Sequence, residues 1–257
     1  MAYIDSHAHL CGPQYQDDIK PIIAGFPAND ISRVLLICCD DEEYKEALCL
    51  AKDYDYFDIA KGIHPEAATS DQSENLAILE KQLSSGKIAV LGEIGLDYYW
   101  IKDNKEYQKE LFISQLHLAD KFGLAVSIHC REASEDMYNV LKEQHHSKRG
   151  VMHCYSGSVE MMERFTKLGY YISLAGPVTF KNARLAKEVA KAIPNDRLLY
   201  ETDSPYLTPV PYRGKRNNPN LVIYVARMIA ELREIDVKAL NDMVSKNYQR
   251  LLGGHNE

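Results

Sequence analysis

Short apolar runs alternate with longer segments of helical periodicity along the whole chain. The short runs show little polar alternation, as expected of strands whose two faces are both covered. They predict strands at Tyr3–Ser6, Arg33–Cys38, Phe57–Lys61, Ile88–Leu91, Ala125–Ile128, Gly150–Met152, Tyr170–Ser173 and Arg197–Tyr200. Apolar residues that return every three or four positions predict helices. These helices are expected at Glu42–Lys52, Glu74–Leu83, Lys105–Phe122, Ser134–Glu143, Val159–Leu168 and Asn182–Ala192.

Eight strand–helix units in 257 residues predict an α/β protein with a distorted (β/α)₈ TIM-type barrel. Further helices after Pro219 would close it. A doubly wound open sheet is the competing topology, but no GxGxxG motif follows an early strand to support its usual cofactor. No low-complexity segment or interdomain linker interrupts the pattern, so we expect residues 1–257 to form a single domain.

The composition narrows the functional classes. Hydrophobic residues make up 46% and charged residues 26% of the chain, which is ordinary for a globular protein. A net charge of −7 argues against a protein that coats nucleic acid, because such proteins are usually basic. No apolar run is long enough to cross a bilayer and no secretory signal is evident, so we expect a cytoplasmic monomer without membrane contact. The six cysteines lack CxxC spacing and are expected to be reduced.

Candidate metal ligands follow the predicted strands. His7 and His9 come after the first strand, and their spacing places both on one side of the chain. The remaining candidates follow the third, fourth, fifth, sixth and eighth strands: His64, Glu93, His129, His153 and Asp203. In a barrel, all these strand ends lie at the same C-terminal rim, so residues distant in sequence would meet in one pocket.

The other four histidines are assigned to structural or surface roles. His117 lies in a predicted helix, His145 and His146 in a solvated turn, and His255 in the tail. Of the five histidines that remain, His7, His9, His129 and His153 join Glu93 and Asp203 as the six ligands of a binuclear site, in which one carboxylate bridges two ions. Imidazole and carboxylate ligands without thiolate suit Zn²⁺, Mn²⁺ or Fe²⁺, and carboxylates with water also suit Mg²⁺. Two such ions support metal-assisted hydrolysis.

Basic residues near the ligands indicate an anionic substrate. Arg131 follows His129 by two positions, and Arg213, Lys215 and Arg216 lie in the loop after Asp203. Guanidinium groups bind phosphate through two parallel hydrogen bonds, so Arg131 and Arg213 are candidate substrate contacts. Tyr155, after His153, would either stack on a base or cover the barrel mouth.

The motifs together resemble the TatD family of metal-dependent deoxyribonucleases, within the amidohydrolase-like barrel superfamily. The resemblance covers essentially the whole chain. HAH alone is a weak signal, whereas GEIGLDYY and TDSPYLTP in this order are highly specific. The motifs are DSHAHL, GIHP, GEIGLDYY, SIHCREA, MHCYSG, ISLAGPVTFKNA, ETDSPYLTPVPYRGKRNNP and NYQRLLG.

The resemblance implies a (β/α)₈ barrel that carries two divalent ions (Mg, Mn or Zn) at its mouth. His7, His9 and Asp203 would hold the first ion and His129 and His153 the second, with Glu93 as the bridge. Asp203 would also orient or deprotonate the attacking water.

The resemblance further implies that Arg131 and His64 contact the phosphate, with Glu201 close enough to matter where a further ion is bound. The implied activity is phosphodiester hydrolysis, as a 3′→5′ exonuclease on DNA single strands or 3′ ends.

Two positions depart from the pattern of many relatives. Glu66 and Tyr212 occupy places where those relatives carry histidine. Neither change removes a metal ligand, so the departures affect substrate preference rather than the type of reaction.

Two alternatives remain open at this stage. The same site could hydrolyse an amide, a lactone or an aminoacyl ester, since fold does not fix function. Many amidohydrolases of the superfamily use a carboxylated lysine as the bridge, whereas Glu93 stands at that position here. A metal-holding scaffold or sensor without catalysis is the second alternative.

Overall fold

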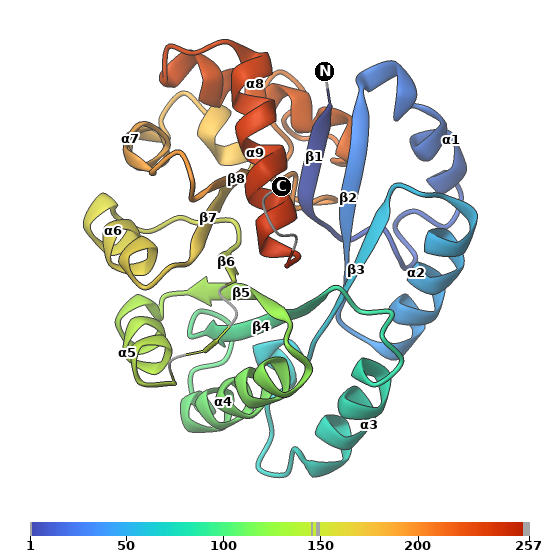
Figure 1. Ribbon diagram of the computed structural model, residues 1–257, viewed down its shortest axis with the longest axis vertical. Helices are drawn as coiled ribbons and strands as arrows, with labels where there is room; N and C mark the ends of the chain where they lie inside the picture. The colour runs from blue at the N-terminus through green and yellow to red at the C-terminus, as the bar shows by residue number, and fades with distance from the viewer. Residues whose placement is uncertain (1, 145, 148–149, 254–257) are drawn as a thin grey trace.

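A computed structural model describes residues 2–144, 146–147 and 150–253. Parallel strands follow one another in chain order around a single eight-stranded sheet (Figure 1). The strands are β1 (Tyr3–Ala8), β2 (Ile31–Cys38), β3 (Phe57–Lys61), β4 (Val90–Asp97), β5 (Ala125–Arg131), β6 (Val151–Met152), β7 (Tyr171–Leu174) and β8 (Leu198–Tyr200). The predicted (β/α)₈ barrel is thereby confirmed.

Helices alternate with the strands and surround the ring, α1–α3 on one side and α5–α7 on the other (Figure 1). They are α1 (Ile19–Ala24), α2 (Asp41–Asp53), α3 (Ser73–Leu83), α4 (Lys105–Phe122), α5 (Ser134–Gln144), α6 (Val159–Lys167), α7 (Arg184–Ala192), α8 (Val222–Leu232) and α9 (Val237–Leu251). Short 3₁₀ turns lie at η1 (Pro27–Asn29), η2 (Pro65–Ala67), η3 (Gly176–Thr179) and η4 (Pro219–Leu221). The helices expected after Pro219 are confirmed as α8 and α9, and α9 packs against β1 and β8.

The barrel closes incompletely between β1 and β8. Ladder pairing runs from β1 through β8, but the first and last strands meet only near their C-terminal ends, at the bridge between Ala8 and Ser204. There the amide of Asp203 donates to the carbonyl of His7 at 3.0 Å, and that of His9 donates to Ser204 at 2.8 Å. This seam accounts for the expected distortion, and it joins two of the segments that carry candidate ligands.

The strands form because their side chains are buried on both faces. Leu35, Leu36 and Ile37 are consecutive in β2 and completely buried, so alternate residues face the barrel interior and the helices. In α4, Leu111, Phe112 and other apolar residues on one face are buried against the barrel. The helix ends at Gly123, whose φ of 66° suits a residue without a Cβ.

The fourth strand is longer than the sequence pattern predicts. The expected strand ended at Leu91, whereas β4 continues through the GEIGLD motif to Asp97. Gly95 permits this extension, because its φ is +145° and a Cβ there would lie 2.0 Å from the carbonyl oxygen of His129. Close approach of β4 to β5 pairs Gly95 with His129. Glu93 therefore lies within the strand and not after it.

Two further expectations concern membranes and thiols. Among the described residues, no helix combines the length and the apolar character that a membrane span needs. All six cysteines are free thiols, as expected.

Candidate metal centre

Two histidines from β1 and its end project to the same side. His7 is completely buried in β1, and His9 follows the strand with its side chain 17% exposed. Their Nε2 atoms lie 3.2 Å apart, and the rings meet edge to face. Alternate residues of an extended chain share a face, which explains why both rings reach the same point.

The carboxylate of Glu93 divides its two oxygens between two sets of histidines. Its Oε2 lies 3.5 Å from Nε2 of His7 and 3.5 Å from Nε2 of His9. Its Oε1 lies 2.7 Å from Nδ1 of His129 and 2.7 Å from Nε2 of His153. One carboxylate thus faces a donor pair from the β1 segment and a donor pair from β5 and the loop after β6, as a bridging ligand would.

Asp203, the aspartate of the ETD stretch that follows β8, completes the cluster. Its Oδ1 lies 3.7 Å from Nε2 of His9 and 3.9 Å from Nε2 of His7. Three groups of donor atoms lie close enough to hold an ion each: His7 with His153 and Asp203, His7 with His9 and Glu93, and His64 with Glu93 and His129. The structure therefore brings all six predicted ligands and His64 together at the C-terminal rim.

The donor atoms themselves fit a cation. Nε2 of His129 lies 2.8 Å from Oδ2 of Asp97, so a proton on Nε2 is donated to that carboxylate. The lone pair of Nδ1 then faces Oε1 of Glu93 at 2.7 Å. Two hydrogen-bond acceptors 2.7 Å apart repel each other unless a proton or a metal ion binds to both of them. Nitrogen and oxygen donors without a thiolate suit Zn²⁺ and Mn²⁺.

Asp97 is a functional group that the motif search did not single out. It is 1% exposed, and Oδ1 accepts the backbone N–H groups of Tyr99 and Trp100 at 2.8 and 3.0 Å. A carboxylate behind a ligating histidine fixes its tautomer and its ring orientation. The signal was the aspartate of GEIGLDYY, but without the extension of β4 nothing in the sequence connected it to His129.

Glu201 plays a similar part behind His153. It is completely buried, accepts the N–H of Cys154 at 2.7 Å, and lies 3.3 Å from Nδ1 of His153. Nε2 of His153 is thereby turned toward Glu93. The family resemblance implied a place for Glu201 near the substrate phosphate and a further ion. Its side chain is directed into the barrel just after β8 and has no exposed surface for a substrate contact.

Asp5 joins β1 to the end of β8 beneath the centre. It accepts the backbone N–H and the hydroxyl of Thr202 at 2.8 and 2.5 Å and the N–H of His7 at 3.3 Å. Burial raises the pKa of Asp5 to about 7. This carboxylate fixes the relative positions of two ligand-bearing segments, and an aspartate inside an apolar strand was its signal in the sequence.

The charges of the protein itself do not favour the metal-binding form of every group in the cluster. Burial opposes charge on His153 and His129, but Glu93 and Glu201 raise the pKa of His153 well above its usual range, and hydrogen bonds to Asp97 and Glu93 raise that of His129. Burial lowers the pKa of His7, and it lowers that of His9 to about 3, so both imidazoles are neutral. Burial alone would raise the pKa of Glu93, but the charge of His153 and hydrogen bonds from the surrounding histidines hold it well below its usual range. Burial raises the pKa of Asp203 to about 8, which a nearby cation would reverse.

Four further predicted contacts occupy different places. His64 lies at the cluster, with Nε2 3.7 Å from Oε1 of Glu93, and Arg131 is exposed on β5, two residues beyond His129. Arg213 lies over the ring of Phe180, 4.4 Å from its centroid. Tyr155 is only 8% exposed, donates its hydroxyl to the carbonyl of Ser158 at 2.8 Å and packs edge to face on Phe165, which leaves little of the ring for stacking on a base.

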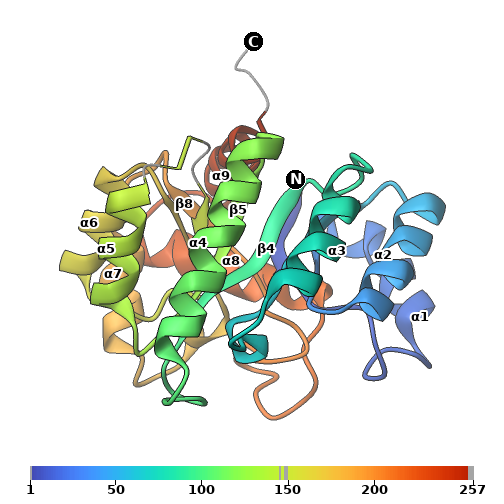
Figure 2. The ribbon, with the colours of Figure 1, turned by 90° about the horizontal axis from the view of Figure 1, so that it is seen from below.

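The loop after β8 borders a cavity of about 480 Å³. In Figure 2 this loop (orange) and the loop after β4 (green) project from the same, lower edge of the barrel. Arg216 bonds the carbonyl of Gln14 and the carboxylate of Asp18, which ties the basic loop to the segment after β1. The lining residues are Gln14, Phe180, Pro205, Leu207, Thr208, Arg213, Gly214, Lys215 and Arg216.

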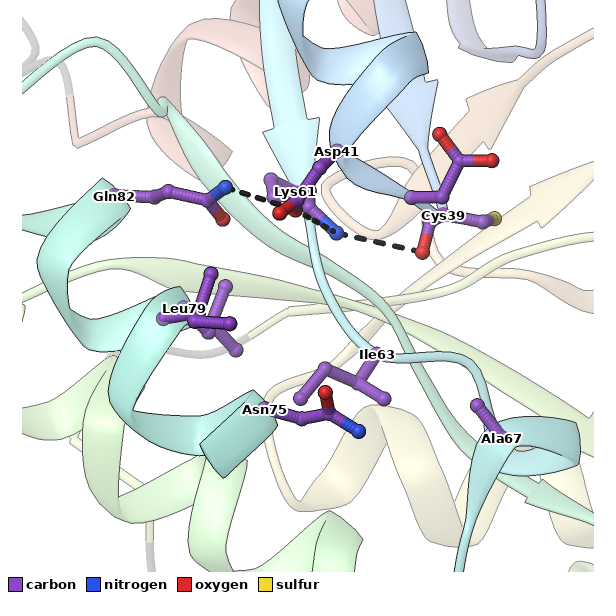
Figure 3. A pocket seen from close by; sticks show the side chains of 10 residues that line it. Cys39, Asp41, Lys61, Ile63, Ala67, Asn75, Leu79 and Gln82 are labelled. Carbon is purple, nitrogen blue, oxygen red and sulfur yellow. Dashed lines mark hydrogen bonds and ion pairs between the residues drawn. The ribbon is translucent and has the colours of Figure 1, made fainter. Parts of the chain in front are cut away.

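A second cavity of about 240 Å³ lies outside the barrel wall, where β3 meets α2 and α3 (Figure 3). The buried ammonium of Lys61 donates to the carbonyls of Cys39 and Gly62 at 3.3 and 3.1 Å and lies 3.8 Å from Asp41. Lys61 therefore faces the helices and not the metal cluster. It does not supply the lysine bridge found in many amidohydrolases.

Two of the remaining histidines, His117 and His146, lie outside the cluster. His117 on α4 is exposed and pairs with Gln144 at 3.1 Å, as expected for a surface role. His146 was expected in a solvated turn, but it is completely buried with Nδ1 2.6 Å from Asp120, because the chain after α5 folds back against α4. His145 and His255 lie outside the described residues.

Known proteins resemble this chain over nearly its full length. Residues 4–253 match the family described as TatD related DNase. An uncharacterized metal-dependent hydrolase of Bacillus subtilis, YabD, is 42% identical, with 96% of this chain and 97% of the relative covered. Its counterpart YcfH of Escherichia coli is 34% identical, with 98% and 96% covered. The crystal structure of YJJV, a TatD homolog from Escherichia coli, superposes with a TM-score of 0.91 at 28% identity and covers 98% of both chains.

Proposed function

Since this chain belongs to the family of TatD-related DNases and is a metal-dependent hydrolase, we propose that it hydrolyses phosphodiester bonds as a 3′→5′ DNA exonuclease. The observation that carries the proposal is the placement of Glu93, whose two oxygens face two separate histidine pairs. In this proposal His7, His9 and Asp203 hold one divalent ion, His129 and His153 the other, and Glu93 bridges them.

Bound divalent ions would polarise the phosphoryl oxygens and lower the pKa of water. Asp203 lies at the edge of the cluster with its side chain 13% exposed, so its carboxylate can accept a proton from the attacking water. Water would add to phosphorus as its proton passes to Asp203, and the bond from phosphorus to the 3′ oxygen of the preceding nucleotide would break. That oxygen would take a proton from solvent water and leave as a hydroxyl, and Asp203 would return its proton to solvent. The departing nucleotide keeps the 5′ phosphate.

Positively charged groups at the mouth would hold the strand. The guanidinium of Arg131 forms no ion pair within the described part of the chain, which leaves its N–H donors for a phosphate. The ring of His64 lies 4.8 Å from that of His129, two residues before Arg131. Arg213 and Lys215 line the cavity bordered by the loop that follows Asp203, and further phosphates of the strand would lie there. Because the whole chain carries a net charge of −7, we expect the protein to attract DNA through these basic groups at the mouth and not through its surface as a whole.

The proposal extends to the setting in which the protein works. We propose a cytoplasmic monomer, formed by one domain over residues 1–257, with Mg²⁺, Mn²⁺ or Zn²⁺ as the working ions. The sequence features that predicted these properties are their support.

Digestion of an end-labelled single-stranded DNA tests the activity. Metal-stripped protein is refilled with Mg²⁺, Mn²⁺ or Zn²⁺, with Glu93→Gln as a control for contaminating nucleases. We expect a ladder that shortens from the 3′ end, depends on metal and is absent for the variant. Cleavage of carboxylic esters or amides without turnover of DNA or RNA would overturn the proposal in favour of the alternative hydrolase. Two bound metals with no turnover of any substrate would favour the scaffold.

A further inference from the structure

Two large aromatic side chains are exposed beside the candidate metal centre, although neither belongs to it. Tyr99 and Trp100 follow β4 directly and are 42% and 63% exposed. Trp100 is the only tryptophan of the chain. Burial of a large aromatic side chain is favourable, so an exposed tryptophan at a site is a candidate for ligand contact.

The two rings and one arginine form a cluster, which we call the aromatic step (Tyr99, Trp100 and Arg131). The rings meet edge to face, with centroids 4.8 Å apart and an angle of 82° between their planes. The guanidinium carbon of Arg131 lies 3.9 Å from the centroid of Tyr99 and 5.3 Å from that of Trp100. Arg131 thus occupies one face of Tyr99, while the more exposed Trp100 retains surface for a further planar group.

A single carboxylate ties the aromatic step to the metal centre. Oδ1 of Asp97 accepts the N–H groups of Tyr99 and Trp100, and Oδ2 of the same group lies 2.8 Å from Nε2 of His129. The backbone under both rings is therefore held in a fixed relation to a candidate ligand. On a flexible loop the two rings would lose more conformational entropy on binding, and the affinity for a ligand would be lower.

We propose that the aromatic step is a nucleobase subsite, in which Trp100 stacks on a base while Arg131 binds the phosphate of the same or the adjoining nucleotide. This inference rests on the proposed function, because it assumes a polynucleotide substrate. Arginine binds phosphate, and aromatic rings stack on any base because every base has a π face. The step gives the protein a preference for strands that carry bases without a preference for sequence.

Binding to the full-length metal-loaded protein tests the subsite through the fluorescence of Trp100. The probe is a phosphorothioate-linked single-stranded oligonucleotide, which resists hydrolysis, and a matched strand in which tetrahydrofuran abasic residues replace the nucleotides near the 3′ end. We expect the normal strand to quench the fluorescence and the abasic strand to bind about 5- to 150-fold more weakly, with little quenching.

Variants separate stacking from general loss of structure. Trp100→Ala should raise the Kd for the normal strand by the same factor of about 5 to 150 and leave the Kd for the abasic strand unchanged. Trp100→Phe keeps an aromatic ring and should therefore retain most of the affinity for the normal strand. Both Kd values are measured with a fluorescent label on the oligonucleotide. Tyr107→Ala, which removes a ring that is 40% exposed on α4, is the matched control and should behave as the unchanged protein does.

The outcomes distinguish this inference from the proposed function. Quenching and base-dependent affinity without cleavage of ordinary DNA would support the subsite and contradict the exonuclease. Cleavage of ordinary DNA with equal affinity for both strands, and no effect of Trp100→Ala, would overturn the subsite alone. Absence of both binding and cleavage would overturn both, and would point to another occupant of the step, such as a protein partner.

Discussion

Nε2 of His129 lies 2.8 Å from Oδ2 of Asp97, on the side of the ring opposite to Glu93. This contact decides which nitrogen of His129 faces the candidate metal centre. A proton on Nε2 is held by Asp97, so the lone pair of Nδ1 points at the cluster. The metal-binding form of the ring is therefore selected by a residue that is not itself a ligand.

Asp97→Asn should weaken metal binding with little change in fold. Because the amide oxygen would still accept the N–H groups of Tyr99 and Trp100, its NH₂ group would face Nε2 and favour the wrong tautomer. We expect metal affinity to fall by about 10- to 100-fold, measured by titration of Mn²⁺ or Zn²⁺ into stripped protein. Asp242→Asn, which removes a surface pair with Lys238 on α9, is the control. Unchanged affinity in Asp97→Asn would contradict the role.

Glu93→Gln should abolish the binuclear site. The amide carries no charge and offers one acceptor oxygen, so it cannot bridge two cations. We expect fewer than two metal equivalents per chain by elemental analysis, a smaller rise of Tm on metal addition, and a fall in kcat of at least about 1,000-fold, the equivalent of several kcal/mol. Glu74→Gln, at an exposed position in the first turn of α3, should retain both metals. Two tightly held metals in Glu93→Gln would rule out the bridge.

Arg213→Gln should weaken DNA binding because it removes a positive charge that attracts phosphate. It should not alter the arrangement of groups around the bond that is cleaved. A phosphate contact at the mouth contributes to the salt dependence of affinity, so its loss should lower the slope of log K against log salt by about 0.7–1. The slope is obtained from oligonucleotide titrations at four or more salt concentrations. Arg184→Gln removes a guanidinium that pairs with Glu188 on α7 and should leave the slope unchanged. Equal slopes for the unchanged protein, Arg213→Gln and Arg184→Gln would show that the DNA strand does not contact Arg213.

Gly95→Ala should prevent β4 and β5 from pairing beside His129. A Cβ at this position would lie 2.0 Å from the carbonyl oxygen of His129, and φ is +145°. We expect a loss of about 3 kcal/mol or more in the free energy of unfolding, measured by urea denaturation. Gly86→Ala is the matched control, because its φ is +68° but nothing lies within 4 Å of the added Cβ, so only about 1–2 kcal/mol should be lost. Equal losses of unfolding free energy in Gly95→Ala and Gly86→Ala would show that β4 and β5 do not need this close approach at Gly95.

Tyr248→Phe should destabilise the barrel in a pH-dependent way. The Tyr248 hydroxyl on α9 donates to Oδ2 of Asp58 on β3 at 2.9 Å. Burial raises the pKa of Asp58 above its ordinary value of 3.8, and the hydrogen bond from Tyr248 opposes that rise. Because the pKa of Asp58 is higher in the folded than in the unfolded protein, Asp58 lowers the free energy of unfolding. This loss grows as the pH rises from 3.8 to the pKa of the folded state.

Removal of the hydroxyl raises the pKa of Asp58 further. The loss of unfolding free energy should therefore be larger at pH 7, about 1.5–3 kcal/mol, than at pH 4, about 1 kcal/mol. Urea denaturation at both pH values measures it. Tyr44→Phe, which removes a 3.3 Å contact with the hydroxyl of Ser85, should show no such difference. The reverse pH dependence would contradict the assignment.

The alternation of strand and helix periods was enough to predict the barrel, because that pattern records which faces of each element are buried. Once the barrel is assumed, strand ends share one rim, so His7, His129 and Asp203 could be brought together from their positions in the chain. The convergence of these side chains was predictable for this reason, and the structure places all six predicted ligands at one rim.

Only the tertiary structure decided what lies behind the ligands. Asp97 reaches His129 because Gly95 lets β4 run on beside β5, and Glu201 reaches His153 because β8 turns it inward. His146 is buried by a chain reversal that no local pattern marks. Periodicity reports burial along one element, whereas the choice of a hydrogen-bond partner depends on how elements distant in sequence pack against one another.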